Sequence, residues 1–275
     1  MTNWIGAVAT THSVELWATS AGHDAAPMTV PLPPGSAPLS EVVAELAARL
    51  PGKADRPIIL CGAPGVAPHA LPCRPFEPGY LLPAGPPRLW LMPALELRTP
   101  YALLPATASL QLAGCLAADP GFDGVICLTD ATSVWAELSA GEVVSATILM
   151  SGALAEAVAA SPAFAALPAG TALSYERFDA DLAETLSRPE RLLRLLADAP
   201  ALPAAEARAR LHAALIGAEL AAARPWWLGQ RLRVLGPQAA LYLRALAAQG
   251  VQASEGSAKA ALLAGFALAA RSVAP

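Results

Sequence analysis

The sequence contains little charge, few aromatic side chains and almost no lysine, and each shortage argues against a class of protein. Charged residues form 15% and aromatic residues 5% of its 275 residues, and its lysines are Lys53 and Lys259. The net charge of −4 comes without a basic stripe or a cluster of arginines among aromatic side chains, which excludes the usual surface for nucleic acid. Hydrophobic residues reach 55%, so the chain has enough apolar surface to fold.

Long apolar segments and metal-binding cysteine patterns are missing as well. No stretch of about 20 residues is both apolar and free of charges and chain-breaking residues, so no membrane-spanning helix is predicted. The first residues lack the basic and apolar regions of a signal peptide, and we expect a cytoplasmic protein. Cys61, Cys73, Cys115 and Cys127 form no C-x-x-C pair, so we expect buried free thiols and no metal site built from protein ligands.

Short apolar runs and helical spacings give the order of the elements. The first half is expected to contain strands over 5–8, 14–18 and 28–30, a helix over 40–50, strands over 57–62 and 88–92, and a helix over 105–118. The second half is expected to contain strands over 124–128, 133–138 and 143–148, then helices over 151–160, 189–198, 204–223, 237–249 and 257–271. We therefore predict an α/β protein with two lobes, residues 1–120 and 121–275.

The opening of the second lobe repeats the opening of the first. Each contains a strand, a turn with threonine, a strand that carries a tryptophan (Trp17 and Trp135) and a Ser-Ala-Gly turn. Two copies in this order indicate a duplicated β-meander. The first turn carries Thr10, Thr11 and Ser13, and small hydroxyl residues in a tight turn can hold phosphate through their hydroxyls and backbone N–H groups.

At these residues the chain resembles the 2-dehydro-3-deoxygalactonokinases, a family of the actin-like ATPase and sugar kinase superfamily. The matching positions are Ile5, Thr11, Trp17, Leu128, Ser133, Trp135, residues 150–154, residues 215–220, Leu235, Gly236, Leu241 and Tyr242. The resemblance implies a two-lobed, ribonuclease H-like fold and an enzyme that uses ATP and Mg²⁺ to phosphorylate 2-dehydro-3-deoxygalactonate at its 6-hydroxyl. It implies a small sugar acid as the partner and leaves a homodimer open.

The resemblance and the chemistry of the residues together assign a candidate site. Phosphate binding is expected from Thr10, Thr11, Ser13 and Thr129, sugar-acid binding from Ser133, Ser151 and Gly152, and adenosine binding from Gly217 and Gly236. Asp130, in the second turn, is the candidate general base for a substrate hydroxyl. Plainer interpretations stay open: Asp130 can cap its own turn, the hydroxyls can be ordinary turn residues, and the glycines can allow close helix packing.

Several charged residues of the family's motifs are absent. Val8 stands where the family has an aspartate that interacts with magnesium, Val134 replaces a lysine and Ala153 replaces a glutamate. The family's Arg-Gly-Glu-Glu element falls on residues 106–109, Ala-Thr-Ala-Ser. Phosphoryl transfer depends on metal ligands and cationic groups. The sequence therefore leaves three hypotheses: an active kinase, a pseudokinase that binds a ligand or protein partner without turnover, and a purely structural or interaction module.

Overall fold

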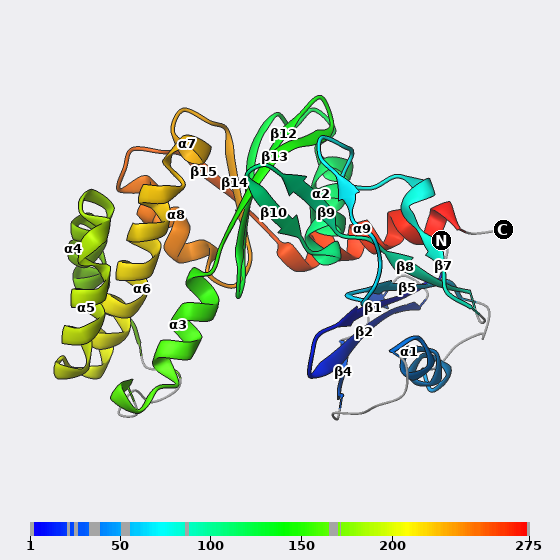
Figure 1. Ribbon diagram of the computed structural model, residues 1–275, viewed down its shortest axis with the longest axis horizontal. Coiled ribbons are helices and arrows are strands. Elements are labelled where there is room, and N and C mark those ends of the chain that lie inside the picture. The colour runs from blue at the N-terminus through cyan, green and yellow to red at the C-terminus, as the bar shows by residue number, and fades with distance from the viewer. Residues whose placement is uncertain are drawn as a thin grey trace. The chain divides into compact units, whose positions relative to one another are not determined.

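The chain forms two compact units, shown in the computed structural model of Figure 1, which describes residues 3–20, 23–24, 27–32, 39–50, 56–85, 88–164, 170 and 172–273. Unit 1 comprises Met1–Phe122, Ser139–Ser145 and Ala258–Pro275, and unit 2 comprises Asp123–Leu138 and Ala146–Ser257. In the described part of the chain, no helix combines the length and the apolar character needed to cross a membrane.

Unit 1 is built around a mixed β-sheet. Its strands are β1 (Ile5–Ala9), β2 (Ser13–Ser20), β3 (His23–Asp24), β4 (Met28–Pro31), β5 (Ile58–Cys61), β7 (Leu82–Pro83) and β8 (Leu89–Met92). They lie in the order β3-β2-β1-β5-β8-β7, and β4 pairs with β2. β1 is antiparallel to β2 and parallel to β5, so the meander predicted at the start of the chain is present. A second sheet, in the order β10-β9-β6, contains β6 (His69–Ala70), β9 (Leu95–Arg98) and β10 (Tyr101–Leu104).

Helices cover both faces of the main sheet of unit 1 (Figure 1). α1 (Leu39–Ala48) buries its apolar side chains on the face that carries Ala7 and Leu16. α9 (Ala258–Ser272) packs on the opposite face, where a Cβ on Gly6 would lie only 2.7 Å from the ring of Phe266. The remaining helical elements are η1 (Pro78–Tyr80) and α2 (Ala106–Ala118), which packs along α9.

Unit 2 repeats the strand arrangement of unit 1. The strands β11 (Gly124–Thr129), β12 (Ser133–Ser139), β13 (Glu142–Leu149), β14 (Leu232–Leu235) and β15 (Ala253–Gly256) form a sheet in the order β13-β12-β11-β14-β15. β11 is antiparallel to β12 and parallel to β14, as β1 is to β2 and β5. The duplication predicted from the two turns is therefore present in the sheets.

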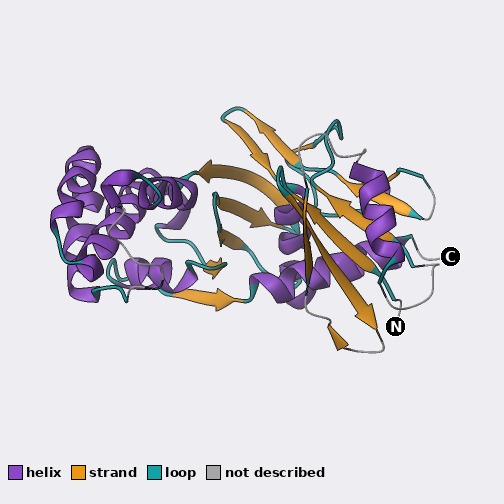
Figure 2. Cartoon of the chain, turned by 90° about the horizontal axis from the view of Figure 1, so that it is seen from below, coloured by secondary structure: helices purple, strands orange, loops and turns teal. Residues whose placement is uncertain are grey.

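The helices of unit 2 follow β13, as predicted, and α4, α5 and α6 lie at the left of Figure 1, within the purple group at the left of Figure 2. They are α3 (Ser151–Ala159), η2 (Pro162–Phe164), α4 (Tyr175–Ser187), η3 (Pro189–Arg191), α5 (Leu192–Asp198), η4 (Ala199–Ala201), α6 (Ala204–Ala222), α7 (Arg224–Trp227) and α8 (Ala239–Ala247). Apolar side chains of α4, α6 and α8 bury one another together with Val125, Cys127 and Trp135 of the sheet. This core lies directly beneath the strands that lead into the second turn.

The structure differs from the predicted elements and lobes. The sequence patterns predict no helix over α4 and no strand over β3, β6, β7, β9, β10, β14 or β15. The predicted second lobe also runs from residue 121 to residue 275, whereas α9 belongs to unit 1. The physical reason is close packing: a Cβ on Gly265 of α9 would lie 2.2 Å from the Leu110 carbonyl oxygen, so these two helices touch through their backbones.

Candidate functional site

The turn between β11 and β12, residues 129–133, is held between two other segments of unit 2. A Cβ added to Gly152, at the start of α3, would lie 2.0 Å from the carbonyl oxygen of Asp130. A Cβ added to Gly236, after β14, would lie 1.9 Å from the carbonyl oxygen of Thr129. The backbone N–H of Ala153 also donates to the Ala131 carbonyl oxygen at 2.6 Å. These contacts join three segments into one assembly: the turn 129–133, the start of α3 and the loop that leads into α8.

Glycine is required at both contact positions for different reasons. Gly152 lies inside a helix, where only the missing side chain allows the backbone of the turn to approach. Gly236 has φ +118°, a conformation that other residues rarely adopt, in addition to the close approach. These contacts agree with the packing interpretation of the two glycines, and they also bring Gly152 and Gly236 against the predicted residues Thr129 and Asp130.

Two of the three hydroxyl side chains of this turn, those of Thr129 and Ser133, are buried. Thr129 is 2% exposed and its Oγ1 donates to the Leu235 carbonyl oxygen at 3.0 Å. Ser133 is 1% exposed and its Oγ donates to the Leu149 carbonyl oxygen at 3.4 Å. Contact of these residues with a ligand would therefore depend on backbone groups or on movement of the turn.

Asp130 is the acidic side chain that the turn exposes. One of its carboxylate oxygens, Oδ1, accepts a hydrogen bond from the Ala131 N–H at 2.9 Å. This is the turn-capping role that the sequence left open. The carboxylate remains exposed, and it can also accept a proton from a bound hydroxyl.

The other predicted residues of unit 2 occupy different surroundings. Ser151 is buried at the first position of α3, next to Gly152. Gly217 lies in the middle of α6, where a Cβ would come within 2.1 Å of Thr185 Oγ1 on α4. The absence of a side chain at Gly217 therefore lets α4 and α6 pack closely. Its predicted adenosine contact has no support from these neighbours.

The corresponding turn of unit 1, residues 9–13, is held by its own hydroxyls. Thr10 Oγ1 accepts the backbone N–H groups of Ser13, at 3.0 Å, and of His12, at 3.3 Å, and it hydrogen-bonds to Ser13 Oγ at 3.0 Å. Thr10, Thr11 and His12 are exposed. A Cβ on Gly62 at the end of β5 would lie 2.3 Å from the Ala9 carbonyl oxygen, so here too a glycine lets the next parallel strand end against the turn.

Few side chains are available to coordinate magnesium. The described residues contain no group of three or more histidine, cysteine, aspartate or glutamate side chains that could hold a metal ion. In unit 1, Val8 lies opposite Glu15 in the β1–β2 pair, so the residue that faces this position across the sheet carries a carboxylate. One exposed carboxylate, such as Asp130, fits a Mg²⁺ ion that arrives on nucleotide phosphates and keeps several waters. Within the described ranges of the chain, the side chains do not fit a metal ion held by protein ligands alone.

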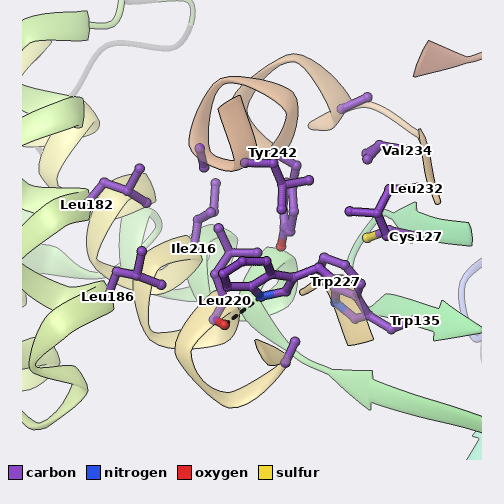
Figure 3. Packing of buried hydrophobic residues seen from close by; sticks show 14 of the residues in the cluster. Cys127, Trp135, Leu182, Leu186, Ile216, Leu220, Trp227, Leu232, Val234 and Tyr242 are labelled. Carbon is purple, nitrogen blue, oxygen red and sulfur yellow. Dashed lines mark hydrogen bonds between the residues drawn. The ribbon is translucent and has the colours of Figure 1, made fainter. Parts of the chain in front are cut away.

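Sequence analysis missed a buried polar cluster beneath the turn of unit 2. Glu219 on α6 is 3% exposed, and its Oε1 accepts the Trp135 Nε1–H at 2.9 Å. The ring of Tyr242 on α8 lies 6.3 Å from the ring of Trp135 (Figure 3). Burial is the main cause that raises the pKa of Tyr242, and Glu219 raises it further, so the hydroxyl keeps its proton at neutral pH. A glutamate among apolar residues of a core helix was the signal in the sequence.

Comparison with known proteins bears on both the fold and the family. A family model described as 2-keto-3-deoxy-galactonokinase matches residues 90–269. No curated protein matches the chain. A Sinorhizobium meliloti protein with the provisional name 2-dehydro-3-deoxygalactonokinase has a similar structure, with a TM-score of 0.84 and 23% identity over 99% of this chain and 97% of that one.

A more distant structure shares the same architecture. Component A of the (R)-2-hydroxyglutaryl-CoA dehydratase from Acidaminococcus fermentans aligns with a TM-score of 0.53 and 10% identity, covering 98% of both chains. These likenesses confirm the predicted actin-like ATPase and sugar kinase fold. Since the family model also spans more than half of the sequence, including both the turn 129–133 and Gly236, the chain belongs to the 2-keto-3-deoxy-galactonokinase family.

Proposed function

We propose that this protein is an ATP-dependent kinase that phosphorylates 2-dehydro-3-deoxygalactonate at its 6-hydroxyl. The observation that carries the proposal is the assembly around the turn 129–133, where Gly152 and Gly236 bring the start of α3 and the loop before α8 against Thr129 and Asp130. Membership of the family supports the type of reaction and the sugar-acid substrate.

The reaction assigns distinct tasks to the residues of this assembly. The oxygen of the 6-hydroxyl attacks the γ-phosphorus of ATP, the bond to the bridging β–γ oxygen breaks, and ADP leaves. Asp130 accepts the hydroxyl proton, because its carboxylate is exposed at the tip of the turn. Backbone N–H groups of the turn 129–133, which Gly152 and Gly236 support, orient the phosphates. Magnesium, when bound with the nucleotide, supplies positive charge that stabilises the transferring phosphoryl group.

The test is a kinase assay with the purified protein, Mg·ATP and 2-dehydro-3-deoxygalactonate, with the phosphorylated product measured by mass spectrometry. Asp130→Asn should lower kcat by about 100-fold or more, since removal of a general base typically costs that much. Asp198→Asn, an exposed acidic residue of unit 2 that pairs with Arg194, should leave kcat unchanged. No product from the unsubstituted protein at high concentration would contradict the proposal.

A second candidate, a pseudokinase, is favoured by the surroundings of the altered motif positions. Val8 packs against an apolar cluster that contains Trp17 and Phe266. Ser109, at the last position of the altered Arg-Gly-Glu-Glu element, is fully buried, and its hydroxyl lies 3.5 Å from the Pro105 carbonyl oxygen. These positions belong to the core of unit 1 and offer no charge to a phosphate.

Calorimetric titration with ATP, with and without Mg²⁺, separates the two candidates. Magnesium-dependent binding with turnover supports the kinase. Binding without turnover supports the pseudokinase. If millimolar ATP does not bind, the protein is neither an active kinase nor a pseudokinase that binds nucleotide. The remaining candidate is then a pseudokinase that binds a protein partner.

A further inference from the structure

Lys259 lies in the first turn of α9, and an aromatic ring holds its ammonium group. Its Nζ lies 5.4 Å from the centroid of the Trp17 ring on β2, within the range of a cation–π interaction. Lys259 is exposed, and no aspartate or glutamate of the described residues forms an ion pair with it. The first turn of a helix repels positive charge, so Lys259 does not serve to stabilise α9.

The identity of residue 17 indicates that the face of its ring has a task. Trp17 is 8% exposed, and its buried Nε1–H has no hydrogen-bond partner in the part of the chain that the structure describes. An unpaired N–H in a core lowers stability, and a phenylalanine would fill the same core without it. Tryptophan, however, offers the strongest cation–π face of the aromatic side chains. The unpaired N–H is therefore explained by the use of the ring face to hold Lys259.

A carboxylate lies on the same face of the sheet as Trp17. Glu15 comes two residues before Trp17 on β2, and successive residues of a strand alternate between its two faces. Glu15 is partly buried, lies opposite Val8 in register, and forms no ion pair with any described residue, Lys259 included. An ammonium group and a carboxylate thus flank one ring without neutralising each other.

These two unpaired charges define the chemistry of a ligand. The Lys259 ammonium has three N–H donors and the Trp17 ring covers only one side of it, so it can donate to an oxyanion. Glu15 repels a bare polyphosphate, but it attracts one that carries Mg²⁺, because waters on the metal ion can donate to the carboxylate. The pair therefore favours a magnesium-bound polyphosphate over a free anion or a free cation.

We propose that Lys259 and Glu15 form a binding site of unit 1 for a magnesium-bound polyphosphate, with the ammonium held over the ring of Trp17. Lys259 donates to phosphate oxygens, and Glu15 accepts from waters on the metal ion. Neither charged residue is among those that the family resemblance assigns to the site. ATP as the source of the polyphosphate rests on the proposed function, whereas binding of the polyphosphate itself does not.

The test uses the two lysines of the chain, Lys259 and Lys53, as reporters in one sample. Mass spectrometry follows the acetylation of each lysine by an N-hydroxysuccinimide ester, without a probe and with saturating Mg·tripolyphosphate or Mg·ATP. Both probes should slow acetylation of Lys259 at least about fivefold and leave Lys53 unchanged. Protection by Mg·ATP alone would support the site and assign a nucleotide to it, and protection by both probes would assign the polyphosphate group.

Two results of this labelling overturn the inference. One is unchanged acetylation of Lys259 with both probes, because the exposed amine would then touch neither of them. The other is equal slowing at Lys259 and Lys53, because it would show that the anions bind without selecting a site.

Variants then assign the roles of the two charges by calorimetry. Lys259→Met should weaken binding of Mg·tripolyphosphate about tenfold, whereas Arg98→Gln, which removes an exposed positive charge of β9, should not. Glu15→Gln should abolish the preference for magnesium, so that tripolyphosphate binds equally with and without the metal ion. Glu41→Gln, at an exposed position in the first turn of α1, should keep that preference. Equal effects in a variant and its control overturn the role of that residue.

Turnover separates this inference from the proposed function. Protection of Lys259 by Mg·ATP, in a protein that forms no phosphorylated sugar acid, contradicts the proposed function and supports the site. Turnover of ATP and the sugar acid with Lys259 unprotected contradicts the site and supports the proposed function.

Discussion

Individual residues of this protein show how one side chain, or its absence, fixes the backbone of a turn. Gly152 and Gly236 were expected to bind ligand, and the structure shows their packing against the carbonyl oxygens of Asp130 and Thr129. Sequence patterns could identify both glycines, because they lie in recognisable motifs. The inward orientation of Thr129 could not be predicted, because it depends on how β11 pairs with β14, far away in sequence.

The close approach at Gly236 predicts a large loss of stability in Gly236→Ala. The added methyl group would meet the Thr129 carbonyl oxygen at 1.9 Å, and alanine is strained at φ +118°. We expect the free energy of unfolding to fall by roughly 3 kcal/mol. Gly250→Ala is the control, since Gly250 has φ +74° with nothing within 4 Å, and it should cost only about 1 kcal/mol. Equal losses in urea denaturation would show that contact with the turn is not the cause.

A single histidine should make the stability of unit 2 depend on pH. Burial, and to a smaller extent the nearby Arg208, lower the pKa of His212 on α6 below its ordinary value. The folded protein therefore favours neutral His212, and this contribution to stability is complete above the unfolded pKa of about 6.5 and is lost as the pH falls below it. Melting temperatures at pH 7.5 and pH 5.0 should differ less in His212→Gln than in the unsubstituted protein. An identical difference in both would contradict the assignment.

At the scale of secondary structure, short strands and a polar helix were the elements that the sequence did not reveal. β14 has four residues and contains Arg233, so it lacks the continuous apolar run expected of a buried parallel strand. α4 carries many charges, although Phe178, Leu182 and Leu186 recur every four residues and are buried. Its Ser174 also caps the helix by accepting the N–H of Arg177. A search based on total hydrophobicity overlooks such a helix.

The contact between α2 and α9 predicts a local effect of glycine substitution. A Cβ on Gly114 of α2 would lie 1.9 Å from the Ala261 carbonyl oxygen of α9, and Gly265 makes the reciprocal contact with Leu110. Gly114→Ala should therefore loosen α9 and raise hydrogen exchange in β1 and β5 more than tenfold, with little effect on β11 and α8. Gly121→Ala, in the same unit but with nothing within 4 Å, should leave the exchange of β1 unchanged. A uniform increase across both units would contradict this prediction.

At the scale of the whole molecule, the two units share a strand topology and differ in the helices that surround their sheets. The repeated turn-and-tryptophan pattern was sufficient to predict the duplication, and the family motifs were sufficient to predict the fold. The position of α9 could not be predicted, because its apolar spacing would suit either sheet and only long-range packing selects unit 1.

The assignment of α9 to unit 1 determines the order in which the protein can be completed during synthesis. The face of β1 that packs on Phe266 stays uncovered while the ribosome makes the intervening residues, which include all of unit 2. Unit 2 has its own core and can close as soon as β15 has emerged, whereas unit 1, although begun first, must wait for the last helix. The first half of the chain is therefore the part most exposed to chaperones and to aggregation until α9 has emerged.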